Sequence, residues 1–202
     1  MGIDLKKGQK ISLEKDDGSK LNSFCVGANW GIIETSSFFS GVKRVSVDLD
    51  LSVGMFNKRN HLHNTVYFRN LVAKGIRHSG DDLIGDVHGD DGLDNEVMTI
   101  NLEEIPAYIE QLVFVLNSYK KQDFATIPFA SIRLYEGVPN QANQIFATYN
   151  IASDARFSGY VSMVLGKLYR NEHNEWIFYA IGEACEAKGL RETLEIVEKR
   201  FL

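Results

Sequence analysis

The sequence is poor in cysteine and has no long apolar segment. Its 202 residues include two cysteines, Cys25 and Cys185, which lie far apart and lack the spacing of a metal-binding pair. A disulfide framework is therefore not expected, and a reducing compartment is. No run of eighteen apolar residues occurs, which argues against a membrane-spanning helix, and the N-terminal residues lack the apolar segment of a signal peptide. We expect a cytoplasmic protein that does not insert directly into a membrane.

Positive charge is not gathered as it is in nucleic-acid-binding proteins. The formal net charge is −5 and no basic stripe occurs, so we expect no nucleic-acid partner. Common catalytic motifs are absent as well. Gly166-Lys167 is followed by Leu168 rather than by the Ser or Thr of a phosphate-binding loop, and neither G-x-S-x-G nor H-E-x-x-H occurs. We therefore expect a protein that is not an enzyme.

The chain is instead rich in short strands. Many segments alternate apolar and polar residues with the period of two that is typical of half-buried strands. The expected strands are 9–14, 22–30, 42–53, 65–68, 97–102, 111–119, 129–136, 144–151, 160–170 and 175–182. Residues 31–41, rich in Gly, Ser and Thr, are expected to be a connection, residues 71–77 a turn or a short strand, and residues 106–109 one helical turn.

The last residues follow a helical period. Leu190, Leu194, Val197 and Phe201 form one apolar stripe after Gly189. Many strands in close succession with one terminal helix predict an all-β fold, a two-sheet β-sandwich with a C-terminal helix. We expect residues 1–202 to form a single domain.

One segment, from His78 to Leu102, is strongly acidic. Seven carboxylates lie from Asp81 to Glu96. Gly80 directly precedes them, and three more glycines and no Lys or Arg lie among them. Such a loop needs compensating charge, and Ca²⁺ takes about 6–8 oxygen ligands that a glycine-rich backbone can supply together with carboxylates. A solvated acidic loop is the alternative. No frame matches an EF-hand, so a metal site would have to be assembled by the fold.

The strand expected at 42–53 bears on this loop. Val45, Val47, Leu49 and Leu51 lie on one face, and Ser46, Asp48, Asp50 and Ser52 lie on the other. Asp48 and Asp50 would then stand about 6.5–7 Å apart on one face. Acidic residues are uncommon in strands, so this pair suggests a bound cation, with a simply solvated face as the alternative.

Histidines offer a different kind of metal site. His61 and His63 could share a face and, with His78 or His88, bind zinc or copper. They lie in the polar segment NKRNHLHN, for which a solvated surface is the ordinary explanation.

The motifs resemble those of the TerD-type tellurium-resistance and stress-response proteins of bacteria. The resemblance runs nearly end to end: LKKGQKISL at 5–13, VDLDLS at 47–52, IRHSGDDLIGD at 76–86, DNE at 94–96, VFVLNSY at 113–119 and LGKLYRNEHNEWIFYAIGE at 165–183. It implies a cytoplasmic, calcium-binding β-sandwich associated with resistance to tellurite, other chemical stress or phage, without established catalytic residues.

The resemblance also implies a set of metal ligands. They come from the DLD strand and the Gly-Asp loop, and two Ca²⁺ ions are expected. The expected ligands are Asp48, Asp50, Asp81, Asp82, Asp90, Asp91, Asp94 and Glu96. The run GDVHGDDGLDNE is longer than the family pattern, so either Asp90-Asp91 or Asp94-Asn95 takes the place of the paired acids, and Asp86 has no assigned role. A charged helix replaces the usual glycine-rich tail.

Three functions are consistent with this chemistry. The first is a calcium-dependent binding or scaffold module of a bacterial tellurite or chemical-stress resistance system, recruiting other resistance proteins, including a membrane complex. The second is a metal-dependent hydrolase or phosphoesterase that uses the same acids. The third is a sandwich in which calcium is purely structural. The sequence leaves the oligomeric state open.

Overall fold

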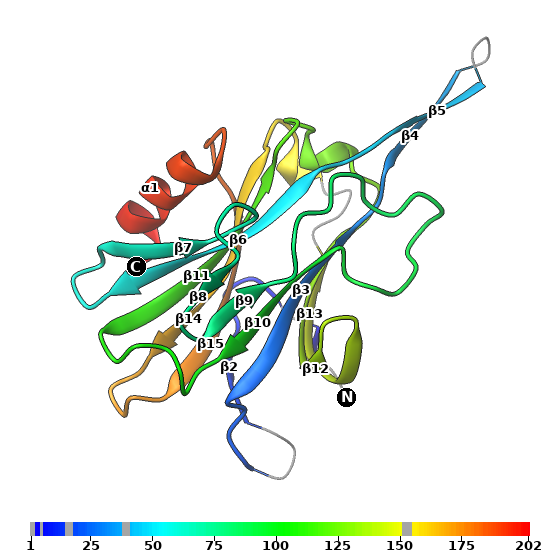
Figure 1. The fold of residues 1–202 in the computed structure, drawn as a ribbon. Helices are drawn as coiled ribbons and strands as arrows, with labels where there is room; N and C mark the ends of the chain where they lie inside the picture. Colours follow the sequence, from blue (N-terminus) through cyan, green and yellow to red (C-terminus); the bar gives the residue numbers. More distant parts are fainter. Residues whose placement is uncertain (1–2, 5, 15–17, 38–40, 151–154) are drawn as a thin grey trace.

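Two β-sheets packed face to face make up most of the protein (Figure 1). The computed structural model describes residues 3–4, 6–14, 18–37, 41–150 and 155–202. The β-sandwich with a C-terminal helix that the strand pattern predicts is confirmed. Within the described residues, no helix is long and apolar enough to cross a membrane.

The first sheet has seven strands and the second has six. In spatial order, the first contains β1 (Ile3–Asp4), β13 (Gln141–Asn150), β12 (Ala130–Val138), β3 (Ser23–Trp30), β10 (Glu96–Asn101), β9 (Ile76–His78) and β8 (Val72–Ala73). The second contains β2 (Lys10–Ser12), β15 (Trp176–Ala184), β14 (Ser162–Arg170), β11 (Ile109–Ser118), β6 (Leu49–Asn57) and β7 (Leu62–Val66). Neighbouring strands run antiparallel, except that β1 is parallel to β13.

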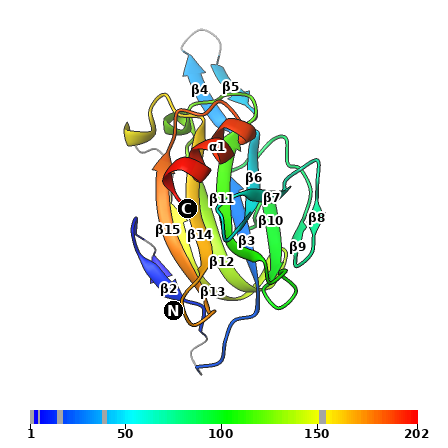
Figure 2. The ribbon, with the colours of Figure 1, turned by 90° about the vertical axis from the view of Figure 1, so that its left-hand side faces the viewer.

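Strand β11 shows why its sequence is apolar on both faces. Leu112, Phe114 and Leu116 face the core between the sheets. Val113 and Val115 point the other way, into a second cluster that contains Leu194 and Val197 of the helix α1 (Leu190–Arg200). Figure 2 shows α1 lying across the outer face of the second sheet. The apolar stripe of the helix therefore packs on the sheet, as its period predicts.

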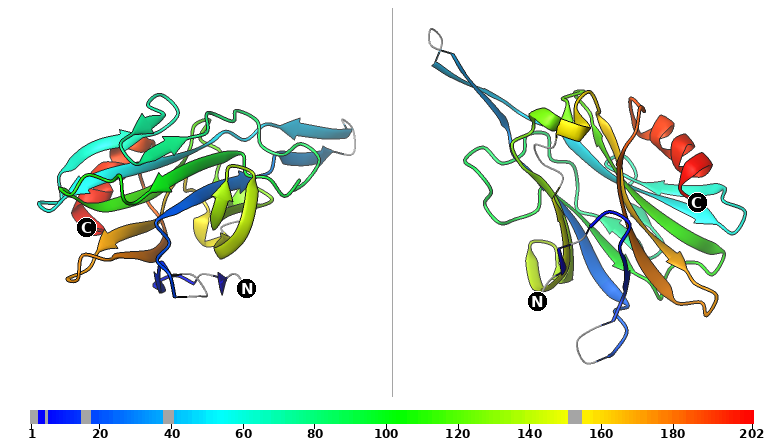
Figure 3. Two further views of the ribbon diagram at one scale, coloured as in Figure 1. Left: turned by 60° about the horizontal axis from the view of Figure 1, so that its bottom comes forward. Right: turned by 180° about the vertical axis from the view of Figure 1, so that it is seen from behind.

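Residues 31–41 are not the simple connection that their composition suggests. Strands β4 (Ile33–Ser37) and β5 (Gly41–Val45) form a separate two-stranded ribbon that projects from one end of the sandwich (Figure 3). Such a ribbon is held by its cross-strand hydrogen bonds. Most of its described side chains are exposed, although Ile33 packs against the core, so its residues need no apolar period. Val42, for example, is exposed.

The single strand expected at 42–53 is also wrong in part. Residues 46–48 lie outside the strands and separate β5 from β6. The alternation continues across this break, so the pattern alone could not locate it. The alternative of a simply solvated polar face is wrong, because Asp48, Asp50 and Ser52 are buried.

Smaller elements complete the chain. Two 3-10 helices span Phe124–Thr126 and Ala155–Phe157. Residues 71–77, expected to be a turn or a short strand, contain the short strand β8 and part of β9. At 106–109 the expected helical turn is only a hydrogen-bonded turn, in which the N–H group of Ile109, the first residue of β11, donates to Pro106 O.

Candidate metal centre

Three aspartates from two distant segments meet beside the start of β6. Asp48 and Asp50 come from the DLD segment, and Asp81 comes from the loop between β9 and β10. One carboxylate oxygen from each lies within 4.8 Å of the others. Asp48 is 2% exposed and Asp50 is 6% exposed, whereas Asp81 is open to solvent. This first cluster brings together residues that the sequence analysis predicted as ligands.

Burying the charged carboxylates of the first cluster is energetically unfavourable without a cation. Burial, reinforced by the charges of Glu96, Asp48 and Asp81, raises the pKa of Asp50 to about 7. Burial also raises the pKa of Asp48, against the opposing effect of Lys120. Asp48 Oδ1 is buried and has no hydrogen-bond partner among the described residues. Such an oxygen loses its hydration without compensation, which suits it to ligate an ion.

The loop over this cluster, residues 79–95, is the acidic loop. It lies at the end of the sandwich from which β4 and β5 project (Figure 1). Asp82 closes its first turn, because Asp82 Oδ1 accepts from the N–H groups of Ile84 and Gly85, each at 2.8 Å. Gly85 has φ +79°, and a Cβ there would lie 2.6 Å from the Trp30 ring, so only glycine fits. Asp82 is not part of the first cluster.

A second cluster lies farther along the acidic loop. Asp86, Asp90 and Asp91 also place one carboxylate oxygen each within 4.8 Å of the others. They are more exposed than Asp48 and Asp50, and they already accept local bonds: Asp91 N donates to Asp86 Oδ2 at 3.2 Å, and Gly92 N donates to Asp90 Oδ1 at 2.8 Å. Asp86 was left without a role by the sequence, and the structure places it here.

Asn95 connects the two halves of the loop. Its Oδ1 accepts from Trp30 N at 2.7 Å, and its Nδ2 donates to Asp86 Oδ1 at 3.1 Å and faces Asp82 Oδ2 at 3.5 Å. A carboxylate here could accept but could not donate to its acidic neighbours. The amide of Asn95 therefore suits this position between two carboxylates better than an acid would.

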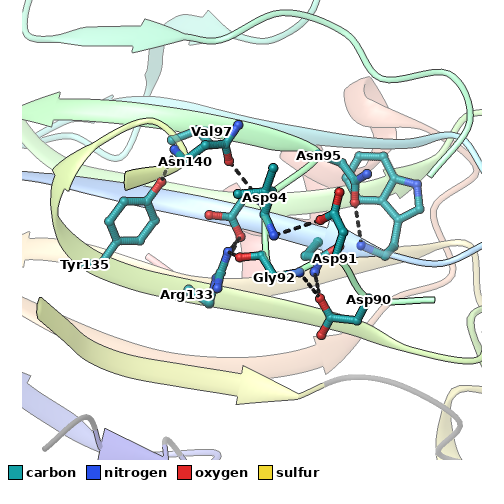
Figure 4. Close-up of polar contacts among 12 residues, drawn as sticks. Asp90, Asp91, Gly92, Asp94, Asn95, Val97, Arg133, Tyr135 and Asn140 are labelled. Atoms are coloured by element: carbon teal, nitrogen blue, oxygen red, sulfur yellow. Dashed lines mark hydrogen bonds and ion pairs between the residues drawn. The ribbon is translucent and has the colours of Figure 1, made fainter. Parts of the chain in front are cut away.

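Asp94 has its own cation (Figure 4). Arg133 Nε and Nη2 both lie 2.9 Å from Asp94 Oδ1, and Nη2 also donates to Gly92 O at 3.0 Å. Asn140 Oδ1 accepts from Asp94 N at 2.9 Å. A Cβ on Gly27 would lie 2.0 Å from the Asp94 carboxylate, so this position of β3 must be a glycine for the carboxylate to fit against the strand. Asp94 thus ties the acidic loop to the outer face of the first sheet.

Glu96 is the most buried of the predicted ligands. It lies at the start of β10 with no exposed surface, and its partners are backbone N–H groups and His78. Burial lowers the pKa of His78, but the hydrogen bond and charge of Glu96 outweigh this and raise it overall. Neither residue belongs to the two carboxylate clusters.

The histidines do not assemble with one another. His63 Nε2 is 2.9 Å from Tyr108 Oη, His61 is exposed, and His78 is buried with Glu96. Over the described ranges, no group of three metal-binding side chains includes a histidine. The arrangement therefore offers two all-carboxylate clusters, whose chemistry suits a hard cation better than zinc or copper.

Some of the residues around these clusters carried little sequence signal. Arg133 sits in β12 with its neighbours Ile132 and Leu134 in the core, so the pattern places it on the outer face without naming a partner. Lys120 Nζ lies 3.6 Å from Asp48 Oδ2, but nothing local to Lys120 indicates this.

Comparison with known proteins gives a consistent family. The model of the TerD domain matches residues 1–195. The stress response protein SCP2 of Bacillus subtilis is 34% identical, over 96% of this chain and 98% of its own length. The tellurium resistance protein TerZ of Serratia marcescens is 31% identical, over 92% of each chain.

A solved structure extends the likeness to the fold. It is that of a homologue of the telluride resistance protein TerD from Streptomyces coelicolor, which matches with a TM-score of 0.67 at 16% identity, over 87% of this chain and 97% of that one. Because the family model covers nearly all of the sequence, the chain belongs to the TerD domain family.

Proposed function

We propose that this protein binds calcium at the first cluster, and a second calcium ion at the second cluster, and that the bound ions order the acidic loop as a calcium-dependent binding module. The observation that carries the proposal is the buried meeting of Asp48, Asp50 and Asp81, with Asp48 Oδ1 left unpartnered. Like charges held together in this way repel one another, and a bound cation would offset the repulsion.

The donor set favours calcium among the common cations. Both clusters offer only carboxylate oxygens, and the loop has backbone carbonyls and open faces for water. Ca²⁺ accepts 6–8 such ligands in irregular geometry, whereas Mg²⁺ demands near-ideal octahedral geometry and keeps its waters. A loop with several positive-φ glycines can adjust to the looser requirement.

The eight predicted ligands then divide by position. Asp48, Asp50 and Asp81 would hold the first ion, and Asp90 and Asp91, with Asp86, would hold the second. Asp82, Asp94 and Glu96 already bond to the turn, to Arg133 and to backbone N–H groups. We assign these three to shaping the loop.

The acidic loop also carries exposed aliphatic side chains. Leu83 is 54% exposed and Ile84 51% exposed, and Val87 and Leu93 are exposed as well. Exposed apolar side chains grouped on one loop are typical of interaction sites. Ion binding would both hold these side chains in place and remove the charge around them, which supports a role in recruiting a partner when calcium is present.

The similar proteins are named for tellurium resistance and stress response. We place this chain in the same kind of system, as a scaffold for other resistance proteins, including a membrane complex. If calcium served only to stabilise the sandwich, removing it would leave partner binding unchanged.

Isothermal titration with calcium tests the metal site. We expect two ions to bind, the melting temperature to rise with calcium and fall with chelator, and magnesium to act much more weakly, because a ligand that binds only the folded form stabilises it. Asp48→Asn and Asp50→Asn should weaken binding, whereas His61→Ala, an exposed control, should not. Absence of a heat signal and of a melting shift would refute the calcium site.

A binding assay then separates the module from the purely structural role. Partners captured with calcium should be lost with chelator and in a Leu83→Ser, Ile84→Ser variant that still binds calcium. Capture that is indifferent to both changes would favour structural calcium.

A further inference from the structure

We infer that Glu96 is a positioning residue rather than a calcium ligand: its buried carboxylate sets the spacing between the DLD segment and the acidic loop. This inference rests on the proposed calcium site. It assigns a role to a residue that the sequence grouped with the ligands.

The two oxygens of Glu96 bond to the two sides of the first cluster. Oε2 accepts from Leu51 N at 2.7 Å, and Oε1 accepts from Asp82 N at 3.3 Å. Leu51 directly follows Asp50, and Asp82 directly follows Asp81. One carboxylate therefore joins the backbone next to one ligand in β6 to the backbone next to another ligand in the loop.

The edge of β6 explains why Leu51 needs this partner. Strand β7 pairs with β6 only as far as Val66 opposite Val53. Beyond that point no strand among the described residues pairs with this edge of β6, so the N–H and C=O groups of Leu51 must be satisfied by other groups. Glu96 takes the N–H group.

His78 takes the C=O group of the same residue. His78 Nε2 lies 3.0 Å from Leu51 O and 3.4 Å from Glu96 Oε2, while His78 Nδ1 accepts from Gly80 N at 3.1 Å. With Nδ1 accepting, Nε2 carries the proton and donates. Glu96 and His78, which lie in the first sheet, thus bond to the N–H and C=O groups of Leu51 in the second sheet.

The same contacts leave Glu96 poorly placed to ligate. Its side chain has no exposed surface, like that of His78. It accepts two backbone N–H bonds and faces the His78 N–H, and it lies outside both groups of clustered carboxylates among the described residues. A glutamine could not replace it, because an amide has one accepting oxygen and would turn its NH₂ toward a donor.

Calcium titration of three variants tests the assignment. Glu96→Gln should bind the same number of ions as the wild type with affinity lowered about 10- to 100-fold, the usual effect of losing a group that orients a ligand. Asp50→Ala should lose the first ion or bind it far more weakly. Glu104→Gln, which removes the same charge from an exposed site in the turn after β10, should behave as the wild type.

Europium luminescence lifetimes in H₂O and D₂O distinguish a ligand from a positioning residue, because they count the water molecules on the bound ion. Asp50→Ala should add water to the ion, and Glu96→Gln should not. Added water or a lost ion in Glu96→Gln would overturn the inference, as would wild-type affinity.

A measurement on the wild type covers the case in which Glu96→Gln does not fold. In ¹³C-labelled protein, calcium should move the carboxyl resonance of Asp50 much farther than that of Glu96, and equal shifts would overturn the inference. If the wild type binds no calcium, the proposed function itself is overturned. If the wild type binds calcium and Glu96→Gln binds it with the same affinity, only this inference is overturned.

Discussion

Lys120 extends its ammonium group to within 3.6 Å of Asp48 Oδ2, at the rim of the first cluster. The same Nζ donates to Leu83 O at 2.9 Å and to Ser46 Oγ at 3.3 Å. A side chain of the protein therefore supplies part of the positive charge that the cluster needs. Because the Lys120 side chain is 43% exposed, its ammonium group could move into solvent when a calcium ion binds.

Replacing Lys120 should strengthen calcium binding. In Lys120→Met we expect the calcium affinity to rise by about 3- to 10-fold, because a unit positive charge a few ångströms from the ion is removed in a partly solvated setting. Stability without calcium should fall by less than about 1 kcal/mol, since the Lys120 side chain is 43% exposed. Titration calorimetry measures the first effect and urea unfolding the second. Lys199→Met, on the exposed side of α1, is the control, and weaker calcium binding in Lys120→Met would contradict the prediction.

Calcium binding and stability should depend on pH in opposite directions. Asp50 has a folded-state pKa of about 7, raised from 3.8 by burial and by neighbouring carboxylates. In chelator the folded state then holds a proton that the unfolded state releases, so the contribution of Asp50 to stability is full below about pH 4 and is lost as the pH rises to about 7.

Calcium binds the ionised carboxylate, so its affinity should rise over the same interval and binding should release protons. Calorimetry in buffers of different ionisation enthalpy measures that release. Asp50→Asn should show less of it, and an affinity independent of pH between 5 and 7.5 would contradict the assignment.

Removing Arg133 should destabilise the protein more than removing an exposed arginine. Arg133→Met leaves the Asp94 carboxylate, which has no exposed side-chain surface, without its cation, and we expect a loss of about 3 kcal/mol in the free energy of unfolding. Adding Asp94→Asn should recover part of the loss, because the amide carries no charge. Arg191→Met, which breaks the exposed pair with Glu195, should cost at most about 0.5 kcal/mol. Equal losses in urea unfolding would refute this ranking.

The C-terminal helix should contribute to stability without affecting the metal. Leu194 of α1 is buried with Phe56, Val113 and Val197 between the helix and the second sheet. Leu194→Ala should therefore lower the free energy of unfolding by about 2–5 kcal/mol through lost contacts and a cavity. Calcium affinity in the folded variant should be unchanged, because this cluster contains none of the acidic residues. A changed affinity would show that the helix and the site are coupled.

Most of the fold could be predicted from local patterns. The strands β3, β10, β11, β12, β14 and β15 and the helix α1 all lie close to where alternation or helical period places them, because each of these elements buries a face of its own. Strand β4 escaped prediction because the ribbon that it forms with β5 projects from the sandwich and leaves most of its described side chains exposed. The break at 46–48 escaped because alternation continues through it.

The sequence by itself determined that the acids concentrate in one glycine-rich loop and that Asp48 and Asp50 share a face, since both are properties of neighbouring residues. Only the tertiary structure decided which acids meet and which are already paired. Asp81 joins Asp48 and Asp50, Asp94 faces Arg133, and Glu96 bonds to Leu51 and Asp82. Most of these partners come from distant strands or loops, and the packing and pairing of the two sheets, which no local pattern encodes, bring them together.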